Sequence, residues 1–359
     1  MRISRRELLL FSGAVCAKAF AKKSQPEPGV LHFDGNPASP SVQVLGPEQH
    51  PVTPIDTGRV PDYVGLLKQP PSRINTRDVE MLAQDLYAAL WKPIDDSGID
   101  QTELHISATG ILRNYPFESL KRPELLMKSD VEFLGQTSKI RYIVGRPRRR
   151  VGLRLGSALA GEKFIYAPMA KNGLELPRLG AAIREARLVT QMTGGHLRIG
   201  LGASKAQLRE DTATSFGVLH LATHATETPE NGPCIALRKG DRRDDDIEFL
   251  TLSDVRAMSI AGRLVVLSAC ESLGPSGMQE TIGLGEAFLD AGAEEVIAAR
   301  WGVDDEAAFA FMGAFYRHLS RGRDSGSALR YARASMITSD VLPYNKAYFW
   351  SNFMSLIRG

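Results

Sequence analysis

Short apolar runs and longer segments of helical periodicity alternate along most of this sequence. The short runs, typical of buried strands, cover residues 104–107, 163–167, 217–222, 263–269 and 295–299. Apolar residues recur at helical spacing over residues 179–193, 203–211, 281–292, 305–320 and 325–337. Fully apolar strands that alternate with helices are typical of a mainly parallel sheet covered on both faces. The pattern therefore predicts an α/β fold.

The N-terminal part of the chain differs in composition and in its pattern of apolar residues. Half of the prolines, 10 of 20, fall between Pro26 and Pro71, and no sustained apolar period accompanies them. We predict a Pro-rich arm or linker over residues 22–75. From about Thr76 the spacing of apolar residues predicts a helix that leads into Trp91, so a single domain is expected over residues 76–359.

The first 21 residues resemble an export signal. Ser4-Arg5-Arg6-Glu7-Leu8-Leu9 is similar to a bacterial twin-arginine motif, and a modest apolar stretch with small residues follows it up to Ala21. Residues 1–21 are therefore predicted to direct a bacterial protein to the periplasm or the medium. The alternative is a short amphipathic leader that is retained, which would leave the protein in the cytoplasm.

Composition excludes several classes of protein. The 359 residues carry 44 Lys and Arg against 41 Asp and Glu, a formal charge of +3, which is too even to suggest nucleic-acid binding. No apolar run reaches the roughly 18–20 residues of a membrane span. Three cysteines (Cys16, Cys234 and Cys270) cannot form a disulfide framework or a Cys-rich zinc site. We therefore expect no metal centre.

Two predicted strands end in residues that can react. His224 follows the strand 217–222, and Cys270 follows the strand 263–269, 46 residues later. If these strands are parallel and close together, the imidazole and the thiol emerge at one edge of the sheet. An imidazole there could take the thiol proton, and the thiolate is the nucleophilic form of cysteine. Backbone amides of the turn after Cys270 could face a developing oxyanion.

The wider context resembles the CHAT domain family, a branch of the caspase-like cysteine peptidases that also includes relatives of separase. Ser268-Ala269-Cys270, with a histidine upstream, is similar to the caspase arrangement. Further matches follow in the order of the family from about residue 80 to residue 358. They are Leu86–Pro93, Ile106–Glu118, Leu219–His224, Val265–Cys270, Gly283–Gly292, Arg300–Asp305, Phe315–Tyr316 and Tyr348–Phe353.

This resemblance implies a caspase-like three-layer α/β/α sandwich and a cysteine endopeptidase. Cys270 would be the nucleophile and His224 the general base, acting on a polypeptide substrate through an acyl-enzyme without a cofactor. The backbone amides of Ala225 and Cys270 would form the oxyanion hole. The family usually has glycine where this chain has Ala225, and its common Gly-Glu-Gly run after the nucleophile is replaced by Gly277–Thr281.

Three acidic residues are candidates for the substrate pocket: Glu227, Asp304 and Asp305. The last two also stand just before a predicted helix, so an N-cap is the simpler interpretation of at least one of them. His220 points to the same sheet face as His224 but lies within an apolar strand, and we predict a structural role for it.

Other polar segments have plain structural interpretations. Asp241–Asp246 lies between His224 and Cys270, where it is either a hairpin tip or a processing loop. Arg146–Arg150 is expected to be a solvated turn. Cys234 is expected to pack in the interior, although in an oxidising compartment it could bridge to Cys270 if the distance allowed.

Two other functions compete with peptide hydrolysis. A non-catalytic caspase-like module would retain His224 and Cys270 without using them and would bind a protein regulator or partner. A thiol esterase or transferase would use the same two residues on an acyl group that is not a peptide.

Overall fold

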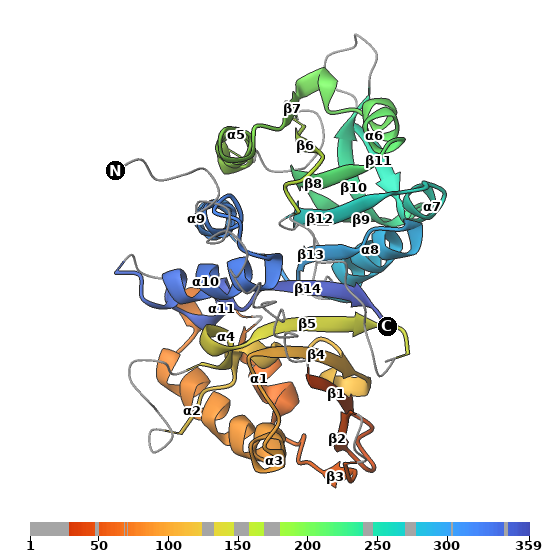
Figure 1. Cartoon of the computed structure of the whole chain (residues 1–359). Coiled ribbons are helices and arrows are strands. Elements are labelled where there is room, and N and C mark those ends of the chain that lie inside the picture. The colour runs from red at the N-terminus through yellow and green to blue at the C-terminus, as the bar shows by residue number, and fades with distance from the viewer. Residues whose placement is uncertain are drawn as a thin grey trace, which may run out of the picture.

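The structure is a computed structural model of the chain. It describes residues 29–46, 50–67, 69, 71–123, 133–146, 158–168, 180–239, 247–269, 278–302, 304–340 and 344–359, with only the backbone of residues 71 and 278–282. One large sheet runs through the molecule from β7 at the top to β3 at the bottom of Figure 1. Its strands, in spatial order, are β3 (Thr53–Pro54), β2 (Ser41–Leu45), β1 (Gly29–Asp34), β4 (Glu103–Ala108), β5 (Lys139–Val144), β14 (Phe353–Arg358), β13 (Glu295–Ala299), β12 (Gly262–Ala269), β8 (Phe216–Thr223), β6 (Glu162–Ala167) and β7 (His196–Ile199).

The sheet consists of two parallel halves that run in opposite directions. In one half β7, β6, β8, β12 and β13 are parallel, and in the other β14, β5, β4 and β1 are parallel. The two halves meet at the antiparallel pair of β13 and β14, where Ala299 lies opposite Phe353. The carboxyl ends of β8, β12 and β13 therefore share one edge of the sheet with the start of β14.

Helices cover both faces of this sheet. The helices of the described residues are α1 (Val60–Leu67), α2 (Thr76–Leu86), α3 (Lys92–Ser97), α4 (Leu134–Thr137), α5 (Gly180–Thr193), α6 (Lys205–Thr212), α7 (Leu252–Arg256), α8 (Met278–Ala291), α9 (Asp305–Leu319), α10 (Ser325–Ile337) and α11 (Ala347–Trp350). A π-helical segment, η2 (Tyr87–Trp91), joins α2 to α3, and short 3₁₀ turns cover η1 (Pro71–Arg73), η3 (Gly110–Leu112), η4 (Phe117–Ser119) and η6 (Gly200–Gly202).

Alternate residues of β13 show which helices lie on which face. Glu295 accepts a hydrogen bond from Ser325 of α10, so α10 lies on its side of the sheet. On this face α9 packs beside α10, and α5 packs beside α9. Val296 points to the opposite face, where α8 packs. A Cβ at Gly285 of α8 would stand 2.6 Å from the side chain of Leu356, so glycine is what allows α8 to approach β14. The three-layer α/β/α sandwich with a mainly parallel sheet is therefore confirmed.

The N-terminal segment differs from its expected form. Where the sequence predicted an arm or linker over residues 22–75, Gly29–Asp34 pairs in parallel with β4, and β2 and β3 extend the sheet beyond it. Leu31 and Phe33 are fully buried. The strands were missed because they are only two to six residues long and lie between prolines and polar turns. Residues 1–28 lie outside the described part of the chain.

A second sheet of three antiparallel strands follows β8. It consists of β9 (Ala225–Thr228), β10 (Gly232–Arg238) and β11 (Ile247–Thr251), with β10 in the centre. β10 also contacts β8 and α8, so the small sheet lies against the end of β8. The segment 241–246, the candidate processing loop, joins β10 to β11 and lies outside the described residues, as do residues 147–150 of the basic cluster.

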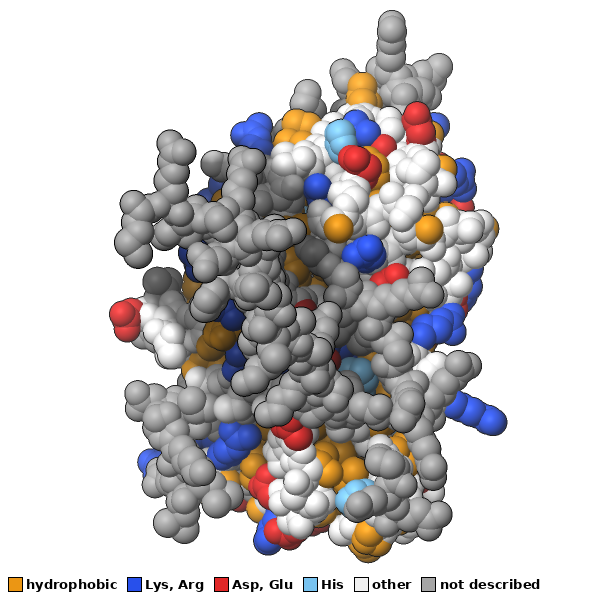
Figure 2. All heavy atoms as spheres, viewed as in Figure 1, with side chains coloured by type: hydrophobic (Ala, Val, Ile, Leu, Met, Phe, Trp, Pro, Cys, Tyr) orange, Lys and Arg blue, Asp and Glu red, His pale blue; other side chains and the backbone are white. Residues whose placement is uncertain are grey.

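The surface has the mixed character that the balanced composition predicts. On the face shown in Figure 2, basic and acidic side chains of the described residues lie interspersed. None of the helices in the described part of the chain is long and apolar enough to cross a bilayer.

Candidate active site

The two strands that carry the predicted reactive residues are direct neighbours. β8 and β12 are parallel and in register from Gly262, opposite Phe216, to Ala269, opposite Thr223. Neighbouring strands lie roughly 4.8 Å apart. His224 is the next residue after Thr223, and position 270 is the next after Ala269. The two strands therefore end at the same level of the same edge of the sheet.

His224 is held close to the end of its strand. Its side chain is 4% exposed, and its carbonyl accepts a hydrogen bond from the N–H of Ala236 at 2.9 Å. The hydroxyl of Thr223 donates to the carbonyl of the same Ala236 at 2.7 Å. Two consecutive residues at the end of β8 are thus tied to β10, which restricts the position of the imidazole.

The candidate nucleophile lies outside the described residues. Ala269 is the last described residue of β12, and the chain is described again from Met278, where α8 begins. Cys270 and residues 271–277 therefore keep the roles that the sequence predicts for them as proposals.

Ala225 and Glu227, the other candidates after β8, belong to β9. Ala225 is fully buried and pairs with Ile235 of β10. Its backbone is extended, a conformation that alanine adopts without strain, so the replacement of the family's glycine is accommodated. Glu227 is an exposed residue of the same strand.

Asp304 and Asp305 stand at the start of α9, just beyond the carboxyl end of β13. Asp304 is the N-cap: its Oδ1 accepts hydrogen bonds from the N–H groups of Glu306 and Ala307 at 3.0 and 3.2 Å. Asp305 is partly buried, and its Oδ2 accepts from the N–H of Ala181 on α5 at 3.4 Å. Burial raises the pKa of Asp305, and the negative charge of Glu185 adds to this effect. The predicted cap is present, and the second carboxylate points to α5.

The residues that follow β13 are clamped by the segment between α11 and β14. The N–H groups of Arg300 and Trp301 both donate to Oδ1 of Asn352, at 2.8 and 2.9 Å, and Nδ2 of Asn352 donates to the carbonyl of Trp301 at 2.8 Å. The indole N–H of Trp301 donates to the carbonyl of Tyr348, whose hydroxyl donates to the carbonyl of Gly302 at 2.5 Å. Because β13 is the neighbour of β12, this clamp fixes one side of the edge at which Cys270 follows its strand.

A fully buried carboxylate, that of Glu118, contacts Arg300, one of the residues held by Asn352. Glu118 accepts hydrogen bonds from the guanidinium of Arg300 at 3.1 Å, from that of Arg333 on α10 at 3.0 Å and from the hydroxyl of Tyr142 on β5 at 2.6 Å. None of the four side chains is more than 3% exposed. Burial lowers the pKa of Arg333, while the charge of Glu118 opposes this effect. One carboxylate therefore joins both halves of the sheet to α10.

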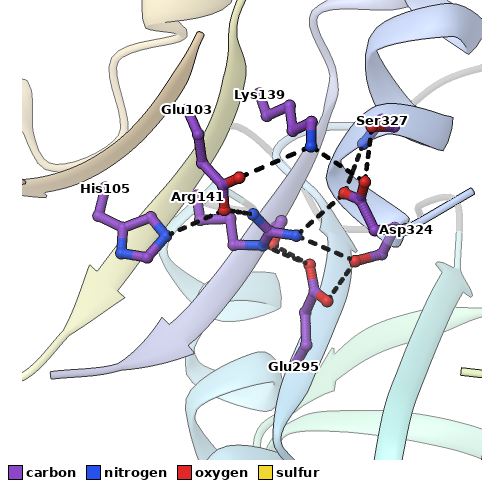
Figure 3. A network of polar contacts seen from close by, with 9 residues as sticks. Glu103, His105, Lys139, Arg141, Glu295, Asp324 and Ser327 are labelled. Atoms are coloured by element: carbon purple, nitrogen blue, oxygen red, sulfur yellow. Dashed lines mark hydrogen bonds and ion pairs between the residues drawn. The ribbon is translucent and has the colours of Figure 1, made fainter. Parts of the chain in front are cut away.

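A second charged cluster lies across β14 on the α10 face (Figure 3). The buried guanidinium of Arg141 contacts Glu103 at 2.6 Å, Glu295 at 3.3 Å and Asp324 at 3.4 Å, and Lys139 also contacts Asp324 at 3.0 Å. Burial by itself would raise the pKa of Asp324, but hydrogen bonds from Ser327 and the charge of Lys139 lower it to about 2. The cluster ties β4, β5 and β13 to the start of α10.

His220 has the structural role that the sequence predicted. It is fully buried on β8, with Nδ1 3.0 Å from the hydroxyl of Tyr316 on α9 and Nε2 2.9 Å from a carboxylate oxygen of Glu185 on α5. The strand that leads to His224 is therefore held against α5 and α9.

Cys234 is a free cysteine within the small sheet. Its Sγ is buried and donates to the carbonyl of Thr226 at 3.4 Å. Burial, aided by the charge of Glu227, raises the pKa of this thiol to about 11. Cys234 is thus a packing residue, as expected, and an unreactive thiol at neutral pH.

Sequence reasoning did not find Glu118, Glu185 or Asn352 as residues that shape the site. A signal was present for two of them, because Glu118 and Asn352 lie in the family-like motifs that end at Glu118 and Phe353. Their partners, up to 215 residues away, could not be inferred. The described residues hold no group of three or more His, Cys, Asp or Glu side chains that could bind a metal ion.

Comparison with known proteins gives a match to a protein family. The sequence profile of the CHAT domain matches residues 80–358. Human tetratricopeptide repeat protein 28 is 24% identical over 269 residues, which are 66% of this chain and 10% of that protein. A chain in the crystal structure of the Saccharomyces cerevisiae separase–securin complex gives a TM-score of 0.42 at 10% identity, over 72% of this chain and 16% of that one. The chain thus spans a small part of the length of both proteins.

Proposed function

Because this chain belongs to the CHAT domain family, we propose that it is a cysteine endopeptidase in which Cys270 is the nucleophile and His224 the general base. The observation that carries the proposal is the parallel pairing of Thr223 with Ala269, since it directs the next residue of each strand to one edge of the sheet. The burial of His224 and its fixed main chain support it further.

In this mechanism His224 takes the proton of the Cys270 thiol, and the thiolate attacks the carbonyl carbon of the substrate peptide bond. The backbone N–H groups of Ala225 and Cys270 donate to the oxyanion that forms. The C–N bond then breaks, His224 gives its proton to the leaving amine, and a thioester to Cys270 remains. Water, activated by His224, hydrolyses this thioester and restores the thiol.

The substrate pocket is proposed to lie between β9 and the start of α9. Glu227 is exposed on β9, and Asp304 and Asp305 follow the clamped residues after β13. The clamp by Asn352 supports the proposal because a binding wall has to keep its shape when a substrate arrives.

Residues 1–21 are proposed to export the protein. The double substitution Arg5→Lys and Arg6→Lys would then retain a fused reporter in the cytoplasm.

The test is cleavage of a proteome-derived peptide pool, with the products mapped by mass spectrometry. The wild-type protein is expected to give defined new termini, and Cys270→Ala and His224→Ala are expected to give none. Thermal unfolding of the variants shows whether they remain folded. Equal turnover by Cys270→Ala would refute the mechanism. Turnover of activated esters alone would indicate an esterase, and partner capture without any turnover would indicate an interaction module.

A further inference from the structure

Four arginine side chains gather where α9 turns into α10. Arg317 lies in the last turn of α9, Arg321 and Arg323 lie in the connection, and Arg330 lies on α10. The first three are exposed, and Arg330 donates to the carbonyl of Gln136. Within the described part of the chain, none of the four forms an ion pair with a carboxylate. The positive charge of this corner is therefore not neutralised by its described neighbours.

The positive charges of these arginines affect the pKa of a histidine that lies among them. His318 is partly buried in the last turn of α9, and its pKa is lowered first by burial and then by the charges of Arg323, Arg321 and Arg317. Asp324, the nearest carboxylate along the chain, is engaged elsewhere, because it pairs with Lys139 and Arg141 and caps α10 through Ser327 (Figure 3).

The main chain of the connection is fixed in one shape. The N–H of Gly322 donates to the carbonyl of Leu319 at 3.0 Å, and that of Arg321 donates to the carbonyl of His318 at 3.3 Å. Gly322 has a φ of +80°, a conformation that suits glycine. Arg321 and Arg323 therefore project from a preformed turn, which reduces the entropy lost when a partner binds.

The aromatic ring of the patch is already covered. Tyr331 stacks on His318 with a centroid distance of 4.7 Å, and the guanidinium groups of Arg323 and Arg330 lie 4.2 and 4.5 Å from its centre. Single-stranded nucleic acids bind by stacking bases on open aromatic faces, which this ring does not offer. The chain also has a formal charge of only +3, whereas nucleic-acid binding domains are strongly basic.

We propose that this corner, formed by Arg317, Arg321, Arg323 and Arg330, is a docking surface for an acidic segment of another polypeptide. Guanidinium groups bind carboxylates through paired hydrogen bonds, and four of them at one corner of the molecule match a run of Asp and Glu side chains. The surface lies at the C-terminal end of α9, whereas Asp304 and Asp305 of the proposed substrate pocket lie at its N-terminal end, so an acidic segment bound here leaves that pocket open.

The test uses the full-length protein and a fluorescein-labelled peptide of alternating glutamate and glycine, with binding followed by fluorescence anisotropy. Changing both Arg321→Gln and Arg323→Gln is expected to weaken binding at least about tenfold, because two charge-assisted contacts are lost. The control changes Arg73→Gln and Arg77→Gln, two exposed arginines on η1 and α2, to remove the same total charge, and is expected to keep the wild-type affinity.

Binding should also raise the pKa of His318, measured by NMR, because an anion beside the arginines offsets their charge. Equal weakening by both pairs of substitutions would overturn the proposal, since it would show attraction to the whole molecule. Absence of binding, or tighter binding of an oligonucleotide of equal charge, would also overturn it. None of these readouts depends on peptidase activity, so they remain decisive if the proposed function fails.

Discussion

Asn352 and Trp301 exchange two hydrogen bonds: the N–H of Trp301 donates to Oδ1 of Asn352 at 2.9 Å, and Nδ2 of Asn352 donates to the carbonyl of Trp301 at 2.8 Å. Asn352 is fully buried and precedes β14, whereas Trp301 follows the neighbouring strand β13. This contact fixes the exit of β13 beside the strand that leads to Cys270, and it connects the shape of the proposed substrate pocket to the packing of the sheet.

Asn352→Ala should loosen that exit. It removes the acceptor of the Trp301 N–H and the donor to the Trp301 carbonyl, whereas the N–H of Arg300 keeps the main-chain carbonyl of residue 352 as an acceptor. We expect a loss of about 2 kcal/mol in the free energy of unfolding. In urea unfolding, Asn231→Ala is the matched control, because this exposed asparagine bonds only within its own turn and its loss should cost less than about 0.5 kcal/mol. Equal losses in the two variants would contradict the role of the clamp.

Glu118→Gln should be strongly destabilising. The substitution keeps the shape of the side chain but leaves Arg300 and Arg333 buried without a counter-charge, and breaking such a buried pair costs about 3–5 kcal/mol. Glu80→Gln is the control, since the pair with Lys121 is partly exposed and should be worth less than about 1 kcal/mol. Calorimetric melting of both variants measures the difference, and a small effect at Glu118 would show that its charge is dispensable.

The two histidines of β8 should separate stability from catalysis. His220→Ala removes the partners of Glu185 and Tyr316 in the interior, and we expect it to lower the free energy of unfolding by about 2–4 kcal/mol. His224→Ala should cost less stability and abolish peptide cleavage. Melting temperature and turnover, measured on both variants, test this assignment. A stable but inactive His220→Ala protein would contradict this assignment, because it would indicate that His220 takes part in catalysis.

The pH dependence of stability should carry the signature of Asp324. Its pKa falls from the usual 3.8 to about 2 on folding, so its ionised form contributes stability above about pH 4 that is lost as the pH falls towards 2. Asp324→Asn keeps an N-cap acceptor for α10 but removes the charge beside Lys139 and Arg141. The stability difference between wild type and variant, from urea unfolding, should be constant above pH 5 and shrink between pH 4 and 2. A difference that does not change over this range would contradict the assignment.

The apolar pattern of the sequence predicted the central strands of the sheet and their parallel direction, but it did not predict the polar contacts in the interior. β8, β12 and β13 were found because most of their residues are apolar, and their parallel arrangement placed His224 and position 270 at one edge. β5 was missed because Lys139 and Arg141 interrupt its period, and these side chains are buried through partners on β4, β13 and α10. From the sequence alone, such charged residues are predicted to lie on the surface, because the distant carboxylates that pair with them are not known.

The central claim, that Cys270 and His224 act together, is tested most directly by active-site labelling. The wild-type protein is treated with a peptidyl acyloxymethyl ketone, which alkylates activated thiols, and intact-mass and peptide mapping follow the reaction over time. We predict a single adduct on Cys270, with no label on Cys234 while the protein is folded, and a labelling rate that falls at least about a hundredfold in His224→Ala, the usual size of a general-base contribution. An unlabelled Cys270, or one labelled equally fast without His224, would contradict the account.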